Sequence, residues 1–359
     1  MVIAMRVGQR RQLVHAGVSP LAELMACLHV LAEPDHHPES RGWLGRIGQE
    51  LTGPLRADLH RFAPLWARYR SRLLFPIDTT LNRSINDEIA VLSTLDDNLF
   101  VPFAADAIHG RSTTFTDAAA VTASAGTWVK DCERRSFTRG DLAHVLVDHA
   151  DRFRRDLVSI LEQCATGFFA QDWERTHHVL DASARSVAAR LGQEQPLDVI
   201  ASLTDIGTTR GSLDTVYFDK LQQGDCIVDR HGLVLIPSIR ATPHVIIKND
   251  LGVPKVLHYP AKPSPDVESA TQEELRRRLL VLSEPARWEL CRHLINESIT
   301  TTELAARTGA SKSAVSRHLR VLREARLIDS HKEGRQVFHR LNASVILRLG
   351  SEVLNGIIR

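Results

Sequence analysis

The sequence predicts a mainly α-helical protein with small β elements: a large helical α+β domain, followed by a small C-terminal helical domain with a β-hairpin. Three observations predict this class. Apolar residues recur at helical spacing from residue 19 to about residue 195, short β-branched runs follow between residues 205 and 260, and amphipathic helical patterns resume at residue 271. Because 359 residues exceed one average core, two or three domains are expected.

The N-terminal helices are predicted from the spacing of their apolar residues. One helix carries its apolar face on Leu21, Leu24, Met25, Leu28 and Leu31. The same spacing recurs over residues 142–149 and 153–161. Ser136 or Thr138 is expected to cap the first of these two helices, because a hydroxyl accepts hydrogen bonds from first-turn amides. A short strand is predicted at residues 2–6.

Strands are predicted after Pro196, where the spacing of apolar residues changes. The short β-branched segments, bounded by Gly, Asp or Pro, are 213–218, 224–228, 232–237 and 244–248. Residues 229–232 are expected to turn the chain and to join the second and third segments as a hairpin.

Prolines set the expected domain boundary. Four of them fall within 12 residues, at Pro254, Pro260, Pro263 and Pro265. Proline lacks an amide donor and restricts the residue before it, so this segment predicts an extended linker. The expected organisation is an N-terminal domain at 1–260 (helical to about 195, strand-rich over 205–260), a Pro-rich linker at 261–270, a C-terminal domain at 271–345 and an apolar helix at 346–359.

The C-terminal domain is predicted to contain four helices with recognisable ends. The expected signals are a capping box of Thr271 with Glu274, Pro285 at the start of the second helix, Thr301 or Thr302 as the cap of the third, Gly309 as its left-handed end, and Ser311 as the cap of the fourth. The first helix has an apolar stripe at Leu275, Leu279 and Leu282. The buried face of the second helix is expected to hold Trp288, Leu290, Cys291, Leu294 and Ile295.

The fourth helix, residues 311–324, is predicted to be amphipathic. Val315, Leu319 and Leu322 share one face, which leaves a basic polar face outside. Two strands follow, at 327–332 and 336–341, with Gly334 in the turn and with Val337, His339 and Leu341 expected on one face. Helix, turn, helix and two-stranded wing is the arrangement that places one helix in the major groove of DNA.

Charge is distributed unevenly, although the net charge is only +2. Residues 1–265 carry 29 Lys and Arg against 31 Asp and Glu, whereas residues 307–340 carry 9 against 3. Such a concentration is expected of a phosphate-binding surface. Contacts with DNA are predicted for Lys312, Ser313, Ser316 and Arg317 in the groove, for Arg320 on a backbone phosphate, and for Lys332 and Arg335 at the wing.

Four segments of the C-terminal domain carry family motifs. They are Ser-Glu-Pro-Ala-Arg-Trp-Glu-Leu-Cys-Arg-His-Leu at 283–294, Thr-Glu-Leu-Ala at 302–305, Val-Ser-Arg-His-Leu-Arg-Val-Leu at 315–322 and Gly-Arg-Gln-Val-Phe-His-Arg-Leu at 334–341. Residues 271 to about 345 thereby resemble the ArsR-type winged helix-turn-helix repressors. The resemblance implies a homodimer that binds inverted repeats of duplex DNA, pairs through its first helix and the helix after the wing, and leaves DNA when an effector binds.

The terminal apolar stripe leaves two interpretations open. It comprises Val345, Ile346, Leu349, Val353, Leu354, Ile357 and Ile358. These residues either form part of a dimer interface or pack on the N-terminal domain. Metal-sensing members of the family use cysteines in the third helix, or carboxylates and histidines in the terminal helix. Here residues 303–307 contain no Cys and the terminal helix offers only Glu352, so metal binding at these positions is not expected.

The N-terminal region carries weaker motifs, at 232–238 (Gly-Leu-Val-Leu-Ile-Pro-Ser) and 256–261 (Val-Leu-His-Tyr-Pro-Ala). On these residues it resembles an uncharacterised domain found ahead of ArsR-type modules. Groups that could supply metal or acid–base chemistry are Asp35 with His36 and His37, His144 with Asp148 and His149, and His177 with His178. Seventeen histidines make such pairs expected by chance, so we predict no catalytic residues, no metal site and no cofactor. Trp43, Trp66, Trp128 and Trp173 are expected in the core rather than around a pocket.

The five cysteines lie far apart, which favours buried free thiols in a reducing cytoplasm. No secretory signal and no membrane span are expected. We therefore predict a cytoplasmic transcriptional regulator, in particular a repressor, with a sensor or dimerisation domain for a small-molecule effector. The alternatives are an N-terminal enzyme with an autoregulatory DNA-binding module, and a winged helix that docks on protein.

Overall fold

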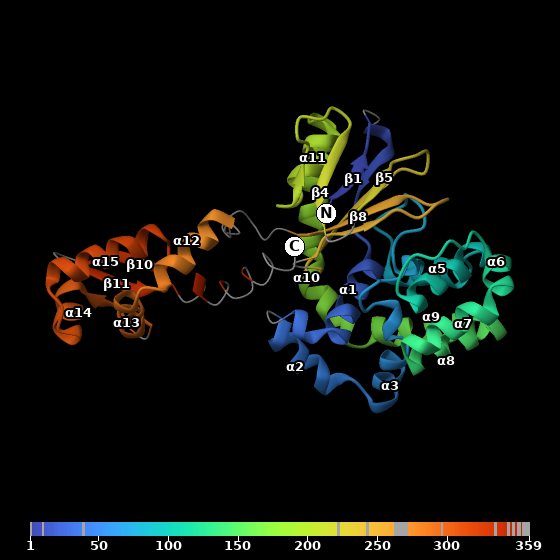
Figure 1. Ribbon diagram of the computed structural model, residues 1–359, viewed down its shortest axis with the longest axis horizontal. Coiled ribbons are helices and arrows are strands. Elements are labelled where there is room, and N and C mark those ends of the chain that lie inside the picture. Colours follow the sequence, from blue (N-terminus) through green and yellow to red (C-terminus); the bar gives the residue numbers. More distant parts are fainter. Residues whose placement is uncertain are drawn as a thin grey trace. The chain divides into compact units, whose positions relative to one another are not determined.

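The computed structural model contains two compact units, residues 1–263 and 264–359 (Figure 1). It describes residues 2–8, 11–37, 40–220, 223–241, 244–261, 272–295, 297–333, 336–342, 345–346, 349 and 353. The N-terminal unit is mainly helical with two small sheets, and the C-terminal unit is a winged helix-turn-helix, so the predicted fold class is confirmed.

The α-helices of the N-terminal unit are α1 Pro20–Ala32, α2 Arg41–Glu50, α3 Gly53–Arg61, α4 Ile85–Ser93, α5 Asp97–His109, α6 Ala118–Ala123, α7 Ala125–Arg135, α8 Phe137–Asp148, α9 Ala150–Thr166, α10 Phe168–Gln193 and α11 Pro196–Ser202. Short 3₁₀ helices are η1 Arg11–Leu13, η2 Pro34–His36, η4 Ala63–Leu65 and η5 Arg72–Leu74. The expected cap at Ser136 is confirmed, because its side chain accepts a hydrogen bond from the Arg139 amide at the start of α8.

Two four-stranded sheets complete this unit. The first has the order β3 Gly207–Thr208, β4 Thr215–Asp219, β1 Val2–Arg6 and β5 Gly224–Ile227; the second has the order β2 Val14–Ala16, β6 Leu233–Ser238, β8 Lys255–Pro260 and β7 Ile246–Lys248. The strand predicted at residues 2–6 is confirmed as β1. It pairs antiparallel with β4 and parallel with β5, while β6 is parallel to both of its neighbours.

The predicted hairpin across residues 229–232 is wrong. β5 and β6 belong to different sheets, because β6 is buried along its whole length and takes parallel neighbours on both sides. Gly232 has a φ of +85°, and an added Cβ would lie 2.8 Å from the Leu13 carbonyl oxygen. The glycine therefore allows the close approach that brings β6 beside β2, a strand that the sequence analysis did not predict.

Two of the four clustered prolines flank a strand instead of lying in an extended segment. The linker predicted at 261–270 lies outside the described residues except for Ala261. Residues 255–260 form β8, a nearly fully buried strand between β6 and β7. Pro254 precedes this strand and Pro260 ends it, so proline here marks strand ends, where a missing amide does not interrupt the ladder.

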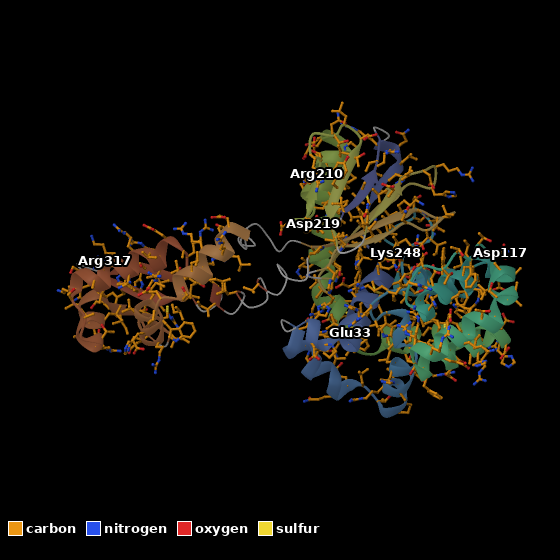
Figure 2. The ribbon with its side chains drawn as sticks, in the orientation of Figure 1. Glu33, Asp117, Arg210, Asp219, Lys248 and Arg317 are labelled. Atoms are coloured by element: carbon orange, nitrogen blue, oxygen red, sulfur yellow. The ribbon has the colours of Figure 1, made fainter. Side chains whose placement is uncertain are left out.

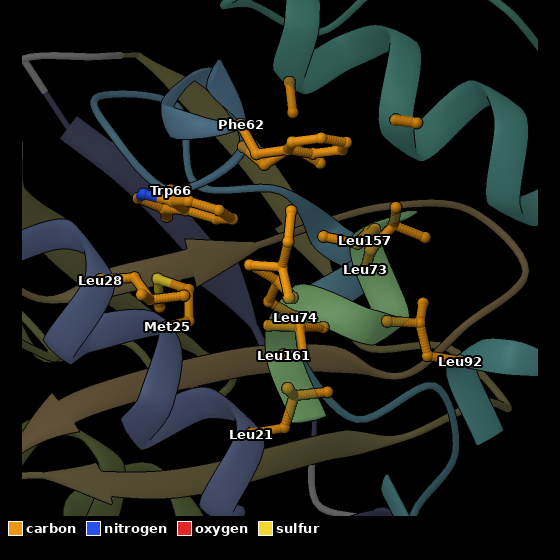
Figure 3. Close-up of a cluster of buried hydrophobic side chains, with 14 of the residues drawn as sticks. Leu21, Met25, Leu28, Phe62, Trp66, Leu73, Leu74, Leu92, Leu157 and Leu161 are labelled. Carbon is orange, nitrogen blue, oxygen red and sulfur yellow. The ribbon is translucent and has the colours of Figure 1, made fainter. Parts of the chain in front are cut away.

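Successive residues of β6 face two hydrophobic cores. Val234 and Ile236 belong to a large core with α1 and the helices around it, whereas Leu233 and Leu235 belong to a second core with residues of both sheets and α11. Figure 3 shows the large core, where side chains of α1 meet aromatic rings and leucines from other segments. Trp66, 1% exposed, lies within it, as the sequence predicted.

Glu88 of α4 is a buried acid that contacts the first residues of α1. Its carboxylate accepts hydrogen bonds from the Ser19 hydroxyl and the Leu21 amide, at 3.0 and 2.7 Å. Burial raises the pKa of Glu88 to about 7, although these two bonds lower it. The Glu88 carboxyl group therefore holds its proton more tightly in the folded protein than in the unfolded chain. As the pH rises from about 4.5 to 7, this difference progressively lowers the free energy of unfolding.

Glu88→Gln is therefore expected to be more stabilising, relative to the native chain, at pH 8 than at pH 5. The expected difference is about 2–3 kcal/mol, since each pKa unit corresponds to about 1.4 kcal/mol. Urea denaturation at the two pH values measures it, and Glu162→Gln at an exposed position is the control. Equal effects at both pH values would contradict the raised pKa.

The C-terminal unit contains α12 Gln272–Leu282, α13 Pro285–Leu294, β9 Ile299–Thr300, α14 Thr301–Thr308, α15 Lys312–Glu324, β10 Ile328–Glu333 and β11 Gln336–Leu341. Its three strands have the order β10-β11-β9. The core of this unit includes Val281, Leu290, Leu294, Ile299, Leu304, Val315, Leu319 and Leu322. In the described part of the chain, no helix combines the length and apolar character that a bilayer span requires.

Several details of this unit differ from the predictions. Thr300 rather than Thr301 or Thr302 caps α14, since its hydroxyl accepts from the Glu303 amide. Trp288 and Ile295 are 59% and 50% exposed, because only every third or fourth residue of α13 faces the core. Thr271 lies outside the described residues. Most of the helix predicted at 346–359 lies outside them as well, and its described residues, Ile346, Leu349 and Val353, are helical.

Candidate nucleic-acid interface

Local sequence signals position α15. The preceding helix α14 ends at Gly309, which has a φ of 67° in the left-handed region. Ser311 then caps α15, with its hydroxyl accepting a hydrogen bond from the Ala314 amide at 3.2 Å. Both expected residues are confirmed in these roles. They fix a tight turn, so that the N-terminal end of α15 begins at a defined place and angle relative to α14.

The two faces of α15 differ sharply. Val315, Leu319 and Leu322 are buried in the core of the unit. The opposite face is exposed and comprises Lys312, Ser313, Ser316, Arg317 and Arg320. The structure therefore brings five of the seven predicted site residues together on one helix face.

The basic residues on this face differ in their surroundings. Among the described residues, Lys312 and Arg317 pair with no carboxylate. Figure 2 shows Arg317 at the outside of the C-terminal unit. Arg320 is already near an acid, with its Nε 3.9 Å from Glu324 Oε1. Arg307 of α14 is neutralised by two carboxylates. Within the exposed face formed by Lys312, Ser313, Ser316, Arg317 and Arg320, the cations without a carboxylate partner among the described residues thus lie in the first half of α15.

The wing is formed by the antiparallel strands β10 and β11. Their pairing begins with Ile328 opposite Leu341 and ends at the tip with Glu333 opposite Gln336. Lys332 is exposed near its tip, and Arg335 lies outside the described residues. Val337 is 41% exposed and does not join His339 and Leu341 in the core, because the wing extends beyond the helices at this point.

His339 links the wing to the helices, a role that the sequence analysis missed. Its ring is buried and lies 3.1 Å from the Thr301 hydroxyl and 2.8 Å from the Ser330 hydroxyl. Burial lowers the pKa of His339, and the nearby Arg323 and His331 lower it further. The uncharged ring therefore ties β11 to β10 and to the first turn of α14. The only sequence signal for His339 is that alternate residues of the second wing strand are expected on one face.

Ser311→Ala is expected to destabilise the start of α15 by about 1 kcal/mol, because it removes the cap. Amides at the start of α15 should then exchange with deuterium about five-fold faster in the free protein. Ser316→Ala makes the same chemical change in the exposed middle of the helix and serves as control. Equal exchange in Ser311→Ala and the native chain would contradict the capping role.

An exposed apolar surface occurs on the first two helices of this unit. Leu279 and Leu280 of α12 are 43% and 61% exposed, and Trp288 of α13 is 59% exposed. Large apolar side chains that remain exposed together are typical of protein-contacting surfaces.

The N-terminal unit separates most of its candidate acid–base groups. His144 is exposed and lies 2.9 Å from Glu133 Oε1, whereas His177 Nδ1 is 2.9 Å from the Trp173 carbonyl oxygen of its own helix. All five cysteines are free and buried, as predicted. Burial raises the pKa of each, for example to about 12 for Cys164. Such thiols are poor nucleophiles at neutral pH.

Comparison with known proteins matches the two units separately. Residues 1–265 match the family of unknown function DUF5937, and residues 282–331 match a helix-turn-helix domain. The transcriptional repressor SmtB homolog of Synechocystis sp. is 33% identical over 25% of this chain and 68% of that protein. The HTH-type transcriptional regulator NmtR of Mycobacterium tuberculosis is 30% identical over 26% of this chain and 78% of that protein.

A solved structure, the ArsR-like transcriptional regulator from Rhodococcus sp. RHA1, is 27% identical over 23% of this chain and 76% of that chain, with a TM-score of 0.22. The helix-turn-helix geometry agrees with the matched helix-turn-helix domain and with the similarity to the SmtB homolog and NmtR. The chain therefore belongs to the DUF5937 family, and its C-terminal unit is a winged helix-turn-helix of the ArsR/SmtB family of DNA-binding transcriptional regulators.

Proposed function

We propose that this protein is a repressor that binds an inverted repeat in duplex DNA as a homodimer, with α15 as the recognition helix and β10–β11 as the wing. The observation that supports this most directly is the exposed basic face at the start of α15, where Lys312 and Arg317 pair with no carboxylate among the described residues. Cationic side chains in that position release counterions when they meet phosphates, which drives binding.

The proposed contacts follow from side-chain length and position. Ser313 and Ser316 are short and allow the helix to approach the base edges, while Lys312 and Arg317 reach into the groove. Arg317 has the planar donor pair that matches guanine O6 and N7. Arg320 lies about one turn further along and is assigned to a backbone phosphate.

The wing is proposed to contact the flanking backbone or minor groove. Lys332 is exposed near the end of β10, and Arg335 is assigned the same role from its place in the sequence between β10 and β11. His339 supports these contacts indirectly, because it fixes the wing against α14.

The homodimer is proposed to form through α12 and the terminal helix. Leu279 and Leu280 leave an exposed apolar surface on α12 that a second copy of the chain would cover. Repression is proposed because the two relatives named as repressors, the SmtB homolog and SdpR of Bacillus subtilis, align with this unit.

Residues 1–260 are proposed to be the sensor domain, joined by a linker at 261–270 to the DNA-binding domain at 271–345. A small-molecule effector would act through this larger domain. We assign it no catalytic activity, since its thiols are buried and have raised pKa values.

Fluorescence anisotropy of the full chain with the DNA fragment upstream of its own gene tests this function. For about six to ten phosphate contacts, affinity should fall by about 10³-fold or more between roughly 50 and 200 mM salt. Hydroxyl-radical footprinting should show two protected segments about one helical turn apart, as expected for a dimer. Absence of salt-sensitive binding would reject DNA recognition, while a single protected segment would reject the dimer on an inverted repeat.

A further inference from the structure

Three histidines that are distant in the sequence meet in the N-terminal unit. His29 lies near the end of α1, His37 follows η2, and His244 precedes β7. Their ring centroids are 5.0, 5.4 and 5.6 Å apart, and the rings meet edge to face. One ring nitrogen of each lies within 4.8 Å of the others. His29 and His37 are buried and His244 is half-buried, so the cluster is largely shielded from water.

We propose that His29, His37 and His244 bind a divalent transition-metal ion of the zinc class. Imidazole nitrogen is a ligand that zinc and neighbouring metals prefer, and three histidines with one further position form a known type of tetrahedral site. Zinc–nitrogen bonds of about 2.0–2.1 Å place the nitrogens of such a site about 3.4 Å apart. From separations of up to 4.8 Å, each nitrogen needs to move inward by less than about 1 Å.

The hydrogen bonds of His29 orient its ring for this role. Its Nδ1 lies 3.0 Å from the Trp66 carbonyl oxygen and 2.9 Å from the Ala67 carbonyl oxygen. Carbonyl oxygens only accept hydrogen bonds, so Nδ1 carries the proton and Nε2 carries the lone pair. A backbone carbonyl that holds the second ring nitrogen is the usual support of a metal-binding histidine. The chain segment 66–67 thus supplies that support here.

In this structure Arg70 contacts His29 Nε2, the nitrogen proposed to bind the metal. Its Nη2 lies 2.6 Å from His29 Nε2 and donates a hydrogen bond to it. A guanidinium and a divalent cation cannot share this position, because both are positive and both need the same lone pair. Metal binding therefore requires Arg70 to swing away. The proposal predicts that Arg70 and the metal compete.

The site is distinct from the DNA-binding surface proposed for α15, and its test requires no DNA. The full chain, treated with a chelator and dialysed, is titrated with Co²⁺ and Zn²⁺. We expect one ion per chain, a visible Co²⁺ absorption typical of nitrogen ligands, and displacement of Co²⁺ by Zn²⁺. His37→Ala and His244→Ala should each weaken binding by about tenfold or more. His178→Ala, an exposed histidine on α10, should leave it unchanged.

Arg70→Gly provides a test that retains all three histidines. Arg70 has a φ of 55°, a left-handed conformation that glycine adopts readily, so the backbone is preserved. Removing the guanidinium should strengthen Co²⁺ binding by about tenfold or more. The proposal is overturned if neither the chelator-treated native chain nor Arg70→Gly binds Co²⁺ or Zn²⁺. Unchanged affinity and absorption in folded His37→Ala and His244→Ala overturn it equally, because the ion would then lie elsewhere.

Discussion

Arg317→Ala is expected to remove the preference of this protein for its operator over unrelated DNA while weak, salt-sensitive binding persists. Arg317 is exposed on α15 and pairs with no carboxylate among the described residues, so its guanidinium is available for a guanine. A bidentate contact of this kind contributes about 1–3 kcal/mol of discrimination, which is about 5- to 150-fold in affinity. Competition anisotropy with operator and scrambled duplexes measures the ratio directly.

Arg292→Ala is a matched control for this prediction. It removes the same charge from the same unit, on an exposed position of α13 outside the proposed recognition helix. Its operator preference should equal that of the native chain. If Arg317→Ala weakens binding to operator and scrambled DNA by the same factor, Arg317 contacts only phosphate and another residue reads the bases.

Arg72→Met is expected to destabilise the N-terminal unit by about 3–5 kcal/mol, the cost of breaking a buried ion pair on one side. The Arg72 guanidinium is 1% exposed and donates to the carbonyl oxygens of Phe75, Pro76 and Pro254, at 3.1, 2.7 and 3.0 Å. Its Nε lies 3.4 Å from Asp250 Oδ2. The substitution would leave this carboxylate without its cationic partner and three carbonyl groups without the guanidinium that donates to them.

Urea denaturation followed by tryptophan fluorescence measures this effect, because four of the five tryptophans lie in the N-terminal unit. Arg155→Met on the exposed face of α9 is the control and should change the free energy of unfolding by no more than about 0.5 kcal/mol. A loss below about 1 kcal/mol for Arg72→Met would show that water or a neighbouring group replaces the guanidinium.

Features encoded within a few residues could be predicted from the sequence. Ser136, Gly309 and Ser311 end or begin helices as expected, since a cap depends on its own backbone angles and on an amide two or three residues away. The buried and exposed faces of α15 follow from helical spacing in the same way. The surface proposed to bind DNA is therefore largely predictable from one short segment.

Features that depend on distant partners could not be predicted. β2 pairs with β6 across more than two hundred residues, and nothing in residues 14–16 alone indicates that partner. Gly232 closes a turn as predicted, with its amide bonded to the Asp229 carbonyl oxygen. The turn does not form a hairpin, because β6 pairs with β2 and the absence of a Cβ at Gly232 allows that approach. The sequence places His37 beside His36, whereas the fold places its ring against those of His29 and His244.

Dimethyl sulfate protection of the operator most directly tests the central claim, that the exposed face of α15 enters the major groove. The reagent methylates guanine N7, which lies in that groove. We predict that the native chain protects at least one guanine in each half-site, and that Arg317→Ala, bound at saturating concentration, leaves that guanine reactive. Two results would contradict this account. In one, every guanine N7 in the saturated native complex reacts as in free DNA; in the other, the native chain and Arg317→Ala protect the same guanines equally.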